Sequence, residues 1–372
     1  MAILGIVFTN IADRHLPELT SHRTLASVPF AGRYRLVDFV LSNMVNSGVS
    51  KVGVITKNHY QSLMDHLGSG RDFDLARKSG GLYLLPPFGG AESQQLYKNH
   101  LEALKGITGF LEDSTEEYVA FSDSDIVYNI SLSDMQAYHV RTGADVTMAY
   151  VPMSYDLPSE AENVMAQVDQ EGRITDLGVY RGAMGERLVG LNLWLMKRTF
   201  LLNIVNDAIA HGHTSFAREV IAPNLGTMKV MGYRYEGYYA FISSLSAYYQ
   251  AHMGLLHPAN QQALLGVPAR PIYTRVQDSP PTRYGANACV SNSLIADGCI
   301  VEGTVENCVL FRGVRIAPGA VVRDSVILSG GVVGRDAHVT AVIADRDVTI
   351  RDTAVLAGSP VYPFFLSANA RV

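Results

Sequence analysis

Residues 2–43 read AILGIVFTNIADRHLPELTSHRTLASVPFAGRYRLVDFVLSN, and this stretch decides the fold. Residues 2–8 form a short apolar run of the kind that a parallel sheet buries on both faces. Residues 38–47 have the pattern of a short helix that Gly48 closes. A polar loop joins the two. Nucleotide-binding α/β domains carry their phosphate-binding loop at this place, so the stretch predicts the scaffold of such a domain.

Residues 27–43, SVPFAGRYRLVDFVLSN, closely match the pattern V-x-F-G-G-x-[FY]-R-x-x-D-F-x-L-S-N. On this segment the chain resembles the sugar-nucleotide pyrophosphorylases, and specifically bacterial glucose-1-phosphate adenylyltransferase. The resemblance implies a doubly wound, Rossmann-like nucleotidyltransferase domain followed by a left-handed parallel β-helix of hexapeptide repeats.

The first half of the stretch departs from the loop of that family, A-G-G-x-G-x-R-L-x-x-L-T. The glycines fall on Asn10, Ile11 and Asp13, the arginine on His15, and the lysine of the following K-P-A on Leu25. Glycines let backbone N–H groups approach a triphosphate, and basic side chains neutralise its charge. A β-branched residue resists positive φ, and a carboxylate repels phosphate. We therefore expect an adenylyltransferase-like fold whose catalytic loop has decayed.

Composition excludes several classes of function. The 372 residues carry a formal charge of −5 and a pI near 6.1, which gives no basic footprint for nucleic acid. No signal sequence and no apolar run long enough to cross a bilayer is present in the sequence. Cys289, Cys299 and Cys308 lack C-x-x-C spacing, so we expect small buried residues in a reducing cytosol rather than disulfides or zinc. The prediction is a soluble, cytoplasmic protein with no nucleic-acid or membrane partner.

Strands and helices alternate up to about residue 255, which indicates one doubly wound domain over residues 1–255. Strands are predicted at 51–56, 118–127, 145–153, 188–196 and 229–235, helices at 59–68 and 91–107, a hairpin around 169–172, and a helix that opens with a capping box of Ser133 and Gln136.

The last third of the chain changes character. Short units such as CVLFRG, VRIAPG and SVILSG repeat β-branched apolar residues at about six-residue spacing, with turn residues between them. This pattern predicts a left-handed β-helix over residues 286–372, after a proline-containing linker over 256–285. An ordinary β-sandwich is the alternative, and a regular spacing of six argues against it.

Nucleotidyl transfer needs a divalent metal that carboxylates hold. The resemblance implies one metal aspartate in a G-D-H triplet, where this chain keeps Asp125, and a second in W-x-D-x-G-T, where Phe241 stands. A solvated or capping carboxylate at a strand end is the other interpretation of Asp125. We expect no resident metal or cofactor, and Mg²⁺ only in a catalytic partner.

The family motif E-K-P, which holds glucose-1-phosphate, falls on Val179, Tyr180 and Arg181, a degenerate sugar-phosphate site. The adenine-facing G-T-A-[DN]-A becomes NHLEA at 99–103. His22 and Arg23 match family positions that bind anionic effectors, and the alternative is that both are solvated surface residues.

Substrate motifs are altered while the framework between them is kept. We therefore expect a non-catalytic or barely active subunit, similar to the regulatory adenylyltransferase subunit of Gram-positive bacteria, in glycogen biosynthesis. It would join a catalytic paralogue, which makes ADP-glucose and pyrophosphate from ATP and glucose-1-phosphate, in a mixed tetramer, and form homo-oligomers when alone. Alternatives are a weakly active nucleotidyltransferase with altered substrates, a hexapeptide-repeat acyltransferase that uses His338, and a free-standing nucleotide or sugar-phosphate sensor.

Overall fold

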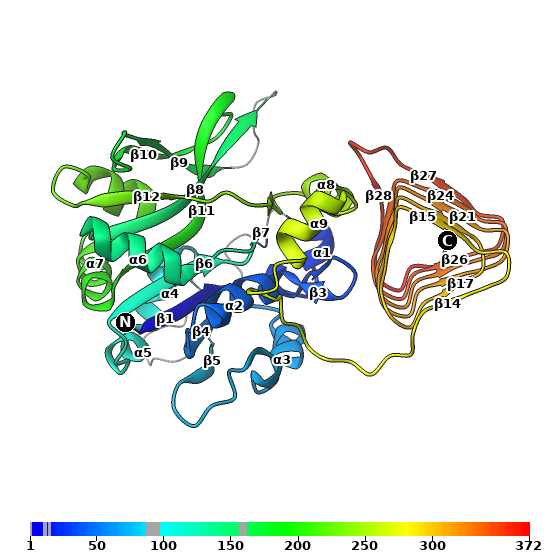
Figure 1. Ribbon diagram of the computed structural model, residues 1–372, viewed down its shortest axis with the longest axis horizontal. Helices are drawn as coiled ribbons and strands as arrows, with labels where there is room; N and C mark the ends of the chain where they lie inside the picture. The colour runs from blue at the N-terminus through cyan, green and yellow to red at the C-terminus, as the bar shows by residue number, and fades with distance from the viewer. Residues whose placement is uncertain (1, 10–12, 14–15, 87–96, 156–161) are drawn as a thin grey trace.

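The computed structural model describes residues 2–9, 13, 16–86, 97–155 and 162–372. An α/β domain built around a twisted sheet lies beside a triangular prism of stacked coils (Figure 1). The chain is therefore a nucleotidyltransferase-like domain followed by a left-handed parallel β-helix, as the sequence predicted.

The sheet of the first domain has nine strands among the described residues, in the order β10-β9-β11-β6-β1-β4-β5, with β8 paired to β11 and β12 paired to β8. Its strands are β1 (Ile3–Phe8), β4 (Lys51–Ile55), β5 (Gly81–Leu85), β6 (Tyr118–Asp123), β8 (Val146–Tyr155), β9 (Asn163–Val168), β10 (Ile174–Tyr180), β11 (Gly185–Lys197) and β12 (Val230–Arg234). The β4, β1 and β6 strands run parallel, and β1 is buried over its whole length. The predicted β-α-β start of the domain is confirmed.

The helices of the first domain lie on both faces of this sheet and between the sheet and the prism (Figure 1). They are α1 (Pro17–Thr20), α2 (Leu36–Asn46), α3 (Gln61–Leu67), α4 (His100–Gly106), α5 (Thr108–Glu112), α6 (Leu132–Thr142), α7 (Arg198–Ala210), α8 (Leu245–Gly254) and α9 (Pro258–Leu265). Two small antiparallel pairs complete the domain: β2 (Pro29–Phe30) with β3 (Tyr34–Arg35), and β7 (Ile126–Tyr128) with β13 (Tyr239–Phe241). No described helix has the length and apolar character needed to span a membrane.

Four predicted helix starts were wrong. The α3 helix begins at Gln61 rather than at residue 59, where the backbone has a positive φ. The α2 helix begins at Leu36 rather than at residue 38, because the Asp38 carboxylate accepts the backbone N–H of Arg35 at 2.9 Å and so lies inside the first turn. The N-cap of α6 is Ser131, whose side chain accepts the Asp134 N–H, and not Ser133. The helix expected over 91–107 is α4, which starts at His100 after Asn99 caps it; residues 91–96 lie outside the described residues.

The β-helix is made of three parallel sheets of five strands each. Their strands are, in order, β14 (Arg283–Tyr284), β17 (Ile300–Val301), β20 (Arg315–Ile316), β23 (Val332–Val333) and β26 (Thr349–Ile350); β15 (Cys289–Ser291), β18 (Thr304–Glu306), β21 (Val321–Arg323), β24 (His338–Thr340) and β27 (Val355–Ala357); and β16 (Leu294–Ile295), β19 (Val309–Leu310), β22 (Val326–Ile327), β25 (Val342–Ala344) and β28 (Phe364–Leu366).

One corner of the prism shows why the repeat needs its turn residues. Asn292, Asn307, Asp324 and Ala341 all have positive φ, a conformation that Asn and Asp adopt more readily than most residues. The Asn292 amide donates to the Asn307 side chain at 2.8 Å, and the Asn307 amide donates to the Asp324 carboxylate at 3.2 Å. This ladder fixes the stacking of successive coils.

Two details of this half differ from the sequence-based expectation. Cys299 and Cys308 are buried as expected, but Cys289 is exposed, because it stacks in register with Thr304 in a column of side chains on the outer face of the prism. The range predicted as a linker, 256–285, contains α9 and β14, and Leu264 of α9 is buried in the core that joins the two domains.

Candidate functional site

The loop after β1 is built around a carboxylate where the family pattern has a glycine. Leu25, at the family lysine position, is buried, and its N–H donates to Asp13 Oδ1 at 2.8 Å. The Thr20 hydroxyl donates to the Asp13 carbonyl at 2.9 Å. Asp13 thus holds the loop together, and Leu25 brings no cation to it. The family arginine position, His15, lies outside the described residues, as do Asn10 and Ile11.

A polar cleft of about 620 Å³ opens at the carboxyl end of β6. His100, the first residue of α4, places Nε2 2.7 Å from Asp123 Oδ1, the last residue of β6. The edge of the Phe8 ring meets the imidazole at 4.6 Å between ring centroids. Phe121, Trp194 and Phe216 pack together and form an aromatic wall of the same cleft.

Asp125 lies in this cleft beside the pair of His100 and Asp123. Its Oδ1 is buried and has no hydrogen-bond partner among the described residues. Burial, and then the neighbouring Asp123 carboxylate, raise the pKa of Asp125 to about 7. The sequence left open that Asp125 is a solvated carboxylate or a capping carboxylate. Its Oδ1 is neither, because it is buried and accepts no hydrogen bond from the described residues. A carboxyl group in this environment exists in both protonation states near neutral pH.

The backbone of Phe241, where the resemblance implies a second metal ligand, lies near that of Asp125, but the Phe241 side chain does not line the cleft that contains Asp125. Phe241 pairs with Ile126 between β13 and β7, and the N–H of Ile242 donates to the Asp125 carbonyl at 2.8 Å. The Phe241 ring packs against Tyr239 with 6.0 Å between ring centroids. An apolar ring thus stands at the sequence position where the family pattern has a carboxylate.

These residues do not fit Mg²⁺, the metal that the family uses. Mg²⁺ requires several oxygen ligands in octahedral geometry. Asp123 already carries a hydrogen bond from His100, and Phe241 offers no oxygen. Within the described ranges, no three His, Cys, Asp or Glu side chains form a group that could hold a metal ion.

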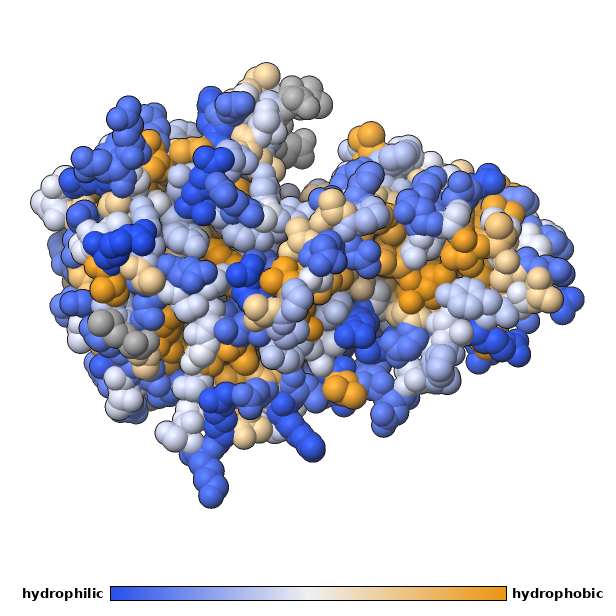
Figure 2. Space-filling view, in the orientation of Figure 1, coloured by the Kyte–Doolittle hydropathy of each residue, from blue (hydrophilic) through white to orange (hydrophobic). Residues whose placement is uncertain are grey.

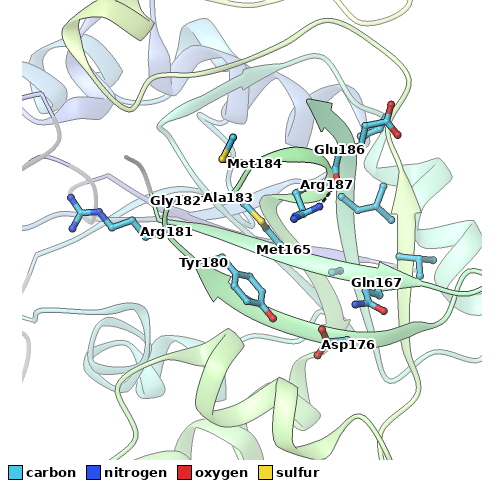
Figure 3. Close-up of a pocket in the computed structure, with 14 residues that line it drawn as sticks. Met165, Gln167, Asp176, Tyr180, Arg181, Gly182, Ala183, Met184, Glu186 and Arg187 are labelled. Atoms are coloured by element: carbon cyan, nitrogen blue, oxygen red, sulfur yellow. Dashed lines mark hydrogen bonds between the residues drawn. The ribbon is translucent and has the colours of Figure 1, made fainter. Parts of the chain in front are cut away.

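The three residues of the degenerate sugar-phosphate site do not all line the same hollow. Val179, on β10, faces the cleft that contains Asp125. Tyr180 and Arg181 instead line a second hollow of about 930 Å³ between β9, β10 and β11. Figure 3 shows the Tyr180 ring extending toward Asp176, while the Arg181 side chain points away from the other labelled residues. Side chains alternate along a strand, so Val179 and Tyr180 face different hollows, and Arg181, just past the end of β10, lines the hollow of Tyr180.

A third hollow, of about 480 Å³, lies between the two domains and is rich in cations. The predicted pair His22 and Arg23 line it together with Arg35, Arg312 and Arg346, and none of the described residues that line it is acidic. His22 and Arg346 are exposed. This geometry fits the predicted anion site better than the alternative of two unrelated surface residues.

The buried cations of this basic hollow are held by neighbours. Arg23 is buried in an ion pair with Asp345 of the β-helix, whose Oδ1 also accepts the N–H of Arg346 at 2.7 Å. Arg35 donates to the carbonyl of Ser62 at 2.6 Å. Burial lowers the pKa of Arg35 to about 10, so it remains charged at neutral pH. An anion here would meet cations that are already positioned.

Sequence reasoning missed two features of these sites. The pairing of His100 with Asp123 joins residues that are 23 positions apart, and the only signal was an altered motif at 99–103. The contribution of Arg312 and Arg346 to the basic hollow depends on how the β-helix docks, which no local pattern reveals.

Comparison with known proteins supports the assignment of both domains. Residues 13–177 match the nucleotidyl transferase family model, and residues 280–360 match the model of the GlmU-like C-terminal hexapeptide. The glycogen biosynthesis protein GlgD of Bacillus subtilis is 33% identical over 373 residues, which cover 98% of this chain and 95% of that protein.

Two further relatives support the same assignment. GlgD of Geobacillus stearothermophilus is 36% identical over 86% of this chain and 82% of its own length. The glucose-1-phosphate adenylyltransferase of Thermotoga neapolitana is 33% identical over 86% of this chain and 76% of its own length. The chain belongs to the family of glucose-1-phosphate adenylyltransferases and GlgD glycogen biosynthesis proteins.

Proposed function

We propose that this chain is a non-catalytic or barely active regulatory subunit of glucose-1-phosphate adenylyltransferase, which acts in the cytoplasm in glycogen biosynthesis. The observation that carries the proposal is Phe241 itself: an apolar ring occupies the sequence position where the resemblance implies a metal-binding carboxylate, and the pairing of β13 with β7 holds its backbone opposite Ile126, the residue after Asp125. Leu25 and the divided positions Val179 and Tyr180 support the same conclusion. The backbone elements of the fold are kept at the positions where the catalytic side chains of the family are replaced.

The partner in this proposal is a catalytic paralogue, which binds Mg²⁺ and carries out the reaction in a mixed tetramer. Apolar side chains exposed on the last coil of the β-helix support assembly: Val355 is 73% exposed and Tyr362 is 84% exposed, with Val361 and Phe364 nearby in sequence. Hydrophobic residues also gather on the β-helix face seen in Figure 2. Exposed apolar patches commonly mark protein interfaces. Without the paralogue, the same surfaces would form homo-oligomers.

The basic hollow is the proposed place of regulation. An anionic effector bound by His22 and Arg346 would contact both domains at once, because these residues belong to different domains. Such a ligand would bias the arrangement of the domains and, through subunit contacts, the response of the partner.

The lone protein, assayed with ATP, glucose-1-phosphate and Mg²⁺, should form ADP-glucose at background, with the catalytic paralogue as the positive control. Turnover in the ordinary enzymatic range, on the order of 1 to 10³ per second, would instead identify a working adenylyltransferase. No feature of the β-helix favours the acyltransferase alternative, since the described His338 side chain lies exposed on the outer face of β24.

A further inference from the structure

The hollow of about 930 Å³ between β9, β10 and β11 is separate from the cleft that contains Asp125, since none of the described residues lines both. Small-molecule sites commonly enclose about 300 to 1,000 Å³, so the hollow is large enough for such a ligand. Tyr180 and Met184, which line it, are 46% and 51% exposed. Large hydrophobic side chains that are exposed in a concave surface mark a candidate binding site.

The Tyr180 ring is seated on a glycine of its own strand. Side chains alternate along β10, so Asp176, Gly178 and Tyr180 share one face. A Cβ placed on Gly178 would lie 2.6 Å from Cε2 of Tyr180 and 2.8 Å from its Cζ, so the ring fills the space that another side chain would need. Figure 3 shows the ring extending along the strand toward Asp176. The ring therefore rests on the backbone of β10, and part of its exposed surface lines the hollow.

Hydrogen-bonding groups and an apolar floor lie next to this ring on the neighbouring strand. Gln167 of β9 is directly opposite Asp176, and Met165 is directly opposite Gly178. Side chains of directly opposite residues lie on one face of the sheet, with their Cβ atoms about 5 Å apart. All of these residues except Gly178 line the hollow. An amide and a carboxylate thus flank the apolar surface that Met165 and the Tyr180 ring provide.

The charges of the hollow balance one another. Among the described residues that line it, Asp176 and Glu186 are acidic, while Arg181 and Arg187 are basic. The basic hollow between the domains is the opposite case, with four arginines, one histidine and no acidic residue among its described lining. Because binding favours complementary charge, an anion fits the basic hollow and gains little from the balanced one. We therefore expect the balanced hollow to take a neutral ligand that is rich in hydrogen-bonding groups.

We infer that this hollow binds a neutral oligosaccharide, with one pyranose ring stacked on Tyr180. A pyranose ring presents a face of C–H groups, which packs on an aromatic ring, and the phenol of tyrosine joins such a surface to a polar end. The sugar hydroxyls both donate and accept hydrogen bonds, which suits the Asp176 carboxylate, the Gln167 amide and the two guanidinium groups of the hollow. The inference goes beyond the proposed function and rests on it only for the choice of glucose as the sugar of the probe.

Titration of the full-length protein with maltotriose, a neutral chain of three glucose units, tests the inference. Saturation-transfer NMR follows the C–H protons of the sugar and gives the Kd in each variant. The wild type should show saturable binding with a Kd of about 1 mM or tighter. Tyr180→Ala removes the ring and should weaken binding at least about fivefold. Tyr180→Phe keeps the ring and should bind within about twofold of the wild type.

Further variants separate this hollow from general effects. Gly178→Ala displaces the Tyr180 ring and should weaken binding although every hydrogen-bonding side chain is kept, and it answers the same question if Tyr180→Ala does not fold. Tyr362→Ala removes an exposed tyrosine of the β-helix and should bind maltotriose as the wild type does. Sorbitol carries hydroxyls like those of glucose but has no ring, so it should show no saturable binding up to about 10 mM.

The inference is overturned if the wild type shows no saturation up to about 10 mM maltotriose, if Tyr180→Ala binds as tightly as the wild type, or if sorbitol binds as well as maltotriose. Binding of AMP at Tyr180 in place of maltotriose would also overturn it and would make the hollow a nucleotide site. These failures differ from failure of the proposed function. A chain that binds no sugar can still regulate a catalytic paralogue, and a chain that binds maltotriose through Tyr180 but does not affect the paralogue would refute the regulatory role alone.

Discussion

Single side chains distinguish this chain from the catalytic pattern of its family. Phe241 and Leu25 keep the backbone places of catalytic residues but present apolar groups, and Asp13 uses its carboxylate to fix the loop. Each of these residues also contributes to packing or hydrogen bonding in the present structure. Their replacement would therefore change local stability as well as chemistry.

Restoring one ligand should not restore the reaction. Phe241→Asp would place a second carboxylate beside Asp125, yet the loop cations and the sugar-phosphate residues would still be missing. Residues that act as a unit have non-additive effects, so ADP-glucose formation should stay at background in a coupled pyrophosphate assay. Phe241→Asn, which adds a polar group without the charge, is the matched control. Measurable turnover in the aspartate variant alone would show that the other substitutions were not limiting.

A buried histidine makes stability depend on pH. His252 Nε2 accepts the N–H of Ala31 at 3.2 Å, and Nδ1 lies 2.9 Å from the Tyr248 carbonyl, so the ring is neutral with its proton on Nδ1. Burial lowers the pKa of His252 to about 4. Its contribution is thus complete above the unfolded pKa of about 6.5 and is lost as the pH falls from there toward 4.

Between pH 7.5 and pH 5 this one group should lower the free energy of unfolding by about 2 kcal/mol. His252→Gln cannot take up the proton, so urea unfolding at the two pH values should show a pH-dependent loss smaller by about that amount. An equal loss in wild type and variant would mean that His252 is protonated in the folded state at pH 5.

At the scale of single elements, local capping decides where the helices of the first domain begin. Ser131 caps α6 by accepting the Asp134 N–H at 3.2 Å, and Asn99 caps α4 in the same way through Glu102. The second cap matters for the cleft, because it sets His100 as the first residue of α4 and thereby directs it toward Asp123.

The cap of α6 can be tested with a matched pair of substitutions. Ser131→Ala removes an acceptor from the first turn and should cost about 1 kcal/mol of stability. Ser133→Ala, two residues later, removes only an exposed hydroxyl that lies 2.9 Å from the Ser131 hydroxyl and should cost less than about 0.5 kcal/mol. Urea unfolding of both variants gives the comparison. A larger loss of stability in Ser133→Ala would instead support Ser133 as the cap of this helix, as the sequence predicted.

The elements that periodicity defines well were predictable. β1 and the hexapeptide coils were recognised because their apolar residues recur at the spacing that burial requires. The helix starts were not, since SLSDMQ offers two serines as caps and only packing of Leu132 selects the first. In the site, the place of Phe241 beside Asp125 followed from a family pattern, whereas the pair of His100 with Asp123 depends on tertiary contact.

At the scale of the whole molecule, one apolar core joins the two domains. Tyr248 and Tyr249 of α8 are buried with Phe311 and Leu328 of the β-helix, and the Tyr249 hydroxyl donates to the Asp324 carbonyl at 2.7 Å. Figure 1 shows α8 between the sheet and the prism. The β-helix is thus packed onto the first domain rather than only tethered to it, which allows a ligand in the basic hollow to act on both.

The ion pair of Arg23 and Asp345 lies beside this core. Asp345→Asn should cost about 3 kcal/mol, because it leaves the buried guanidinium of Arg23 without a counter-charge. Adding Arg23→Met should recover part of that loss, since the unpaired charge is then removed as well. Urea unfolding of the two single variants and the double variant measures this coupling. Additive losses would show that the two side chains do not interact in solution.

We propose that this chain regulates a catalytic paralogue and does not itself convert substrate. The most direct measurement mixes the purified protein with the catalytic paralogue from the same source, determines the size of the complex by light scattering, and assays ADP-glucose formation with and without anionic effectors. We predict a mixed tetramer in which the kcat, the substrate affinity or the effector response of the paralogue is changed, although the chain alone stays inactive. If neither the size of the complex nor any of these kinetic properties changes on mixing, the chain is not a regulatory subunit.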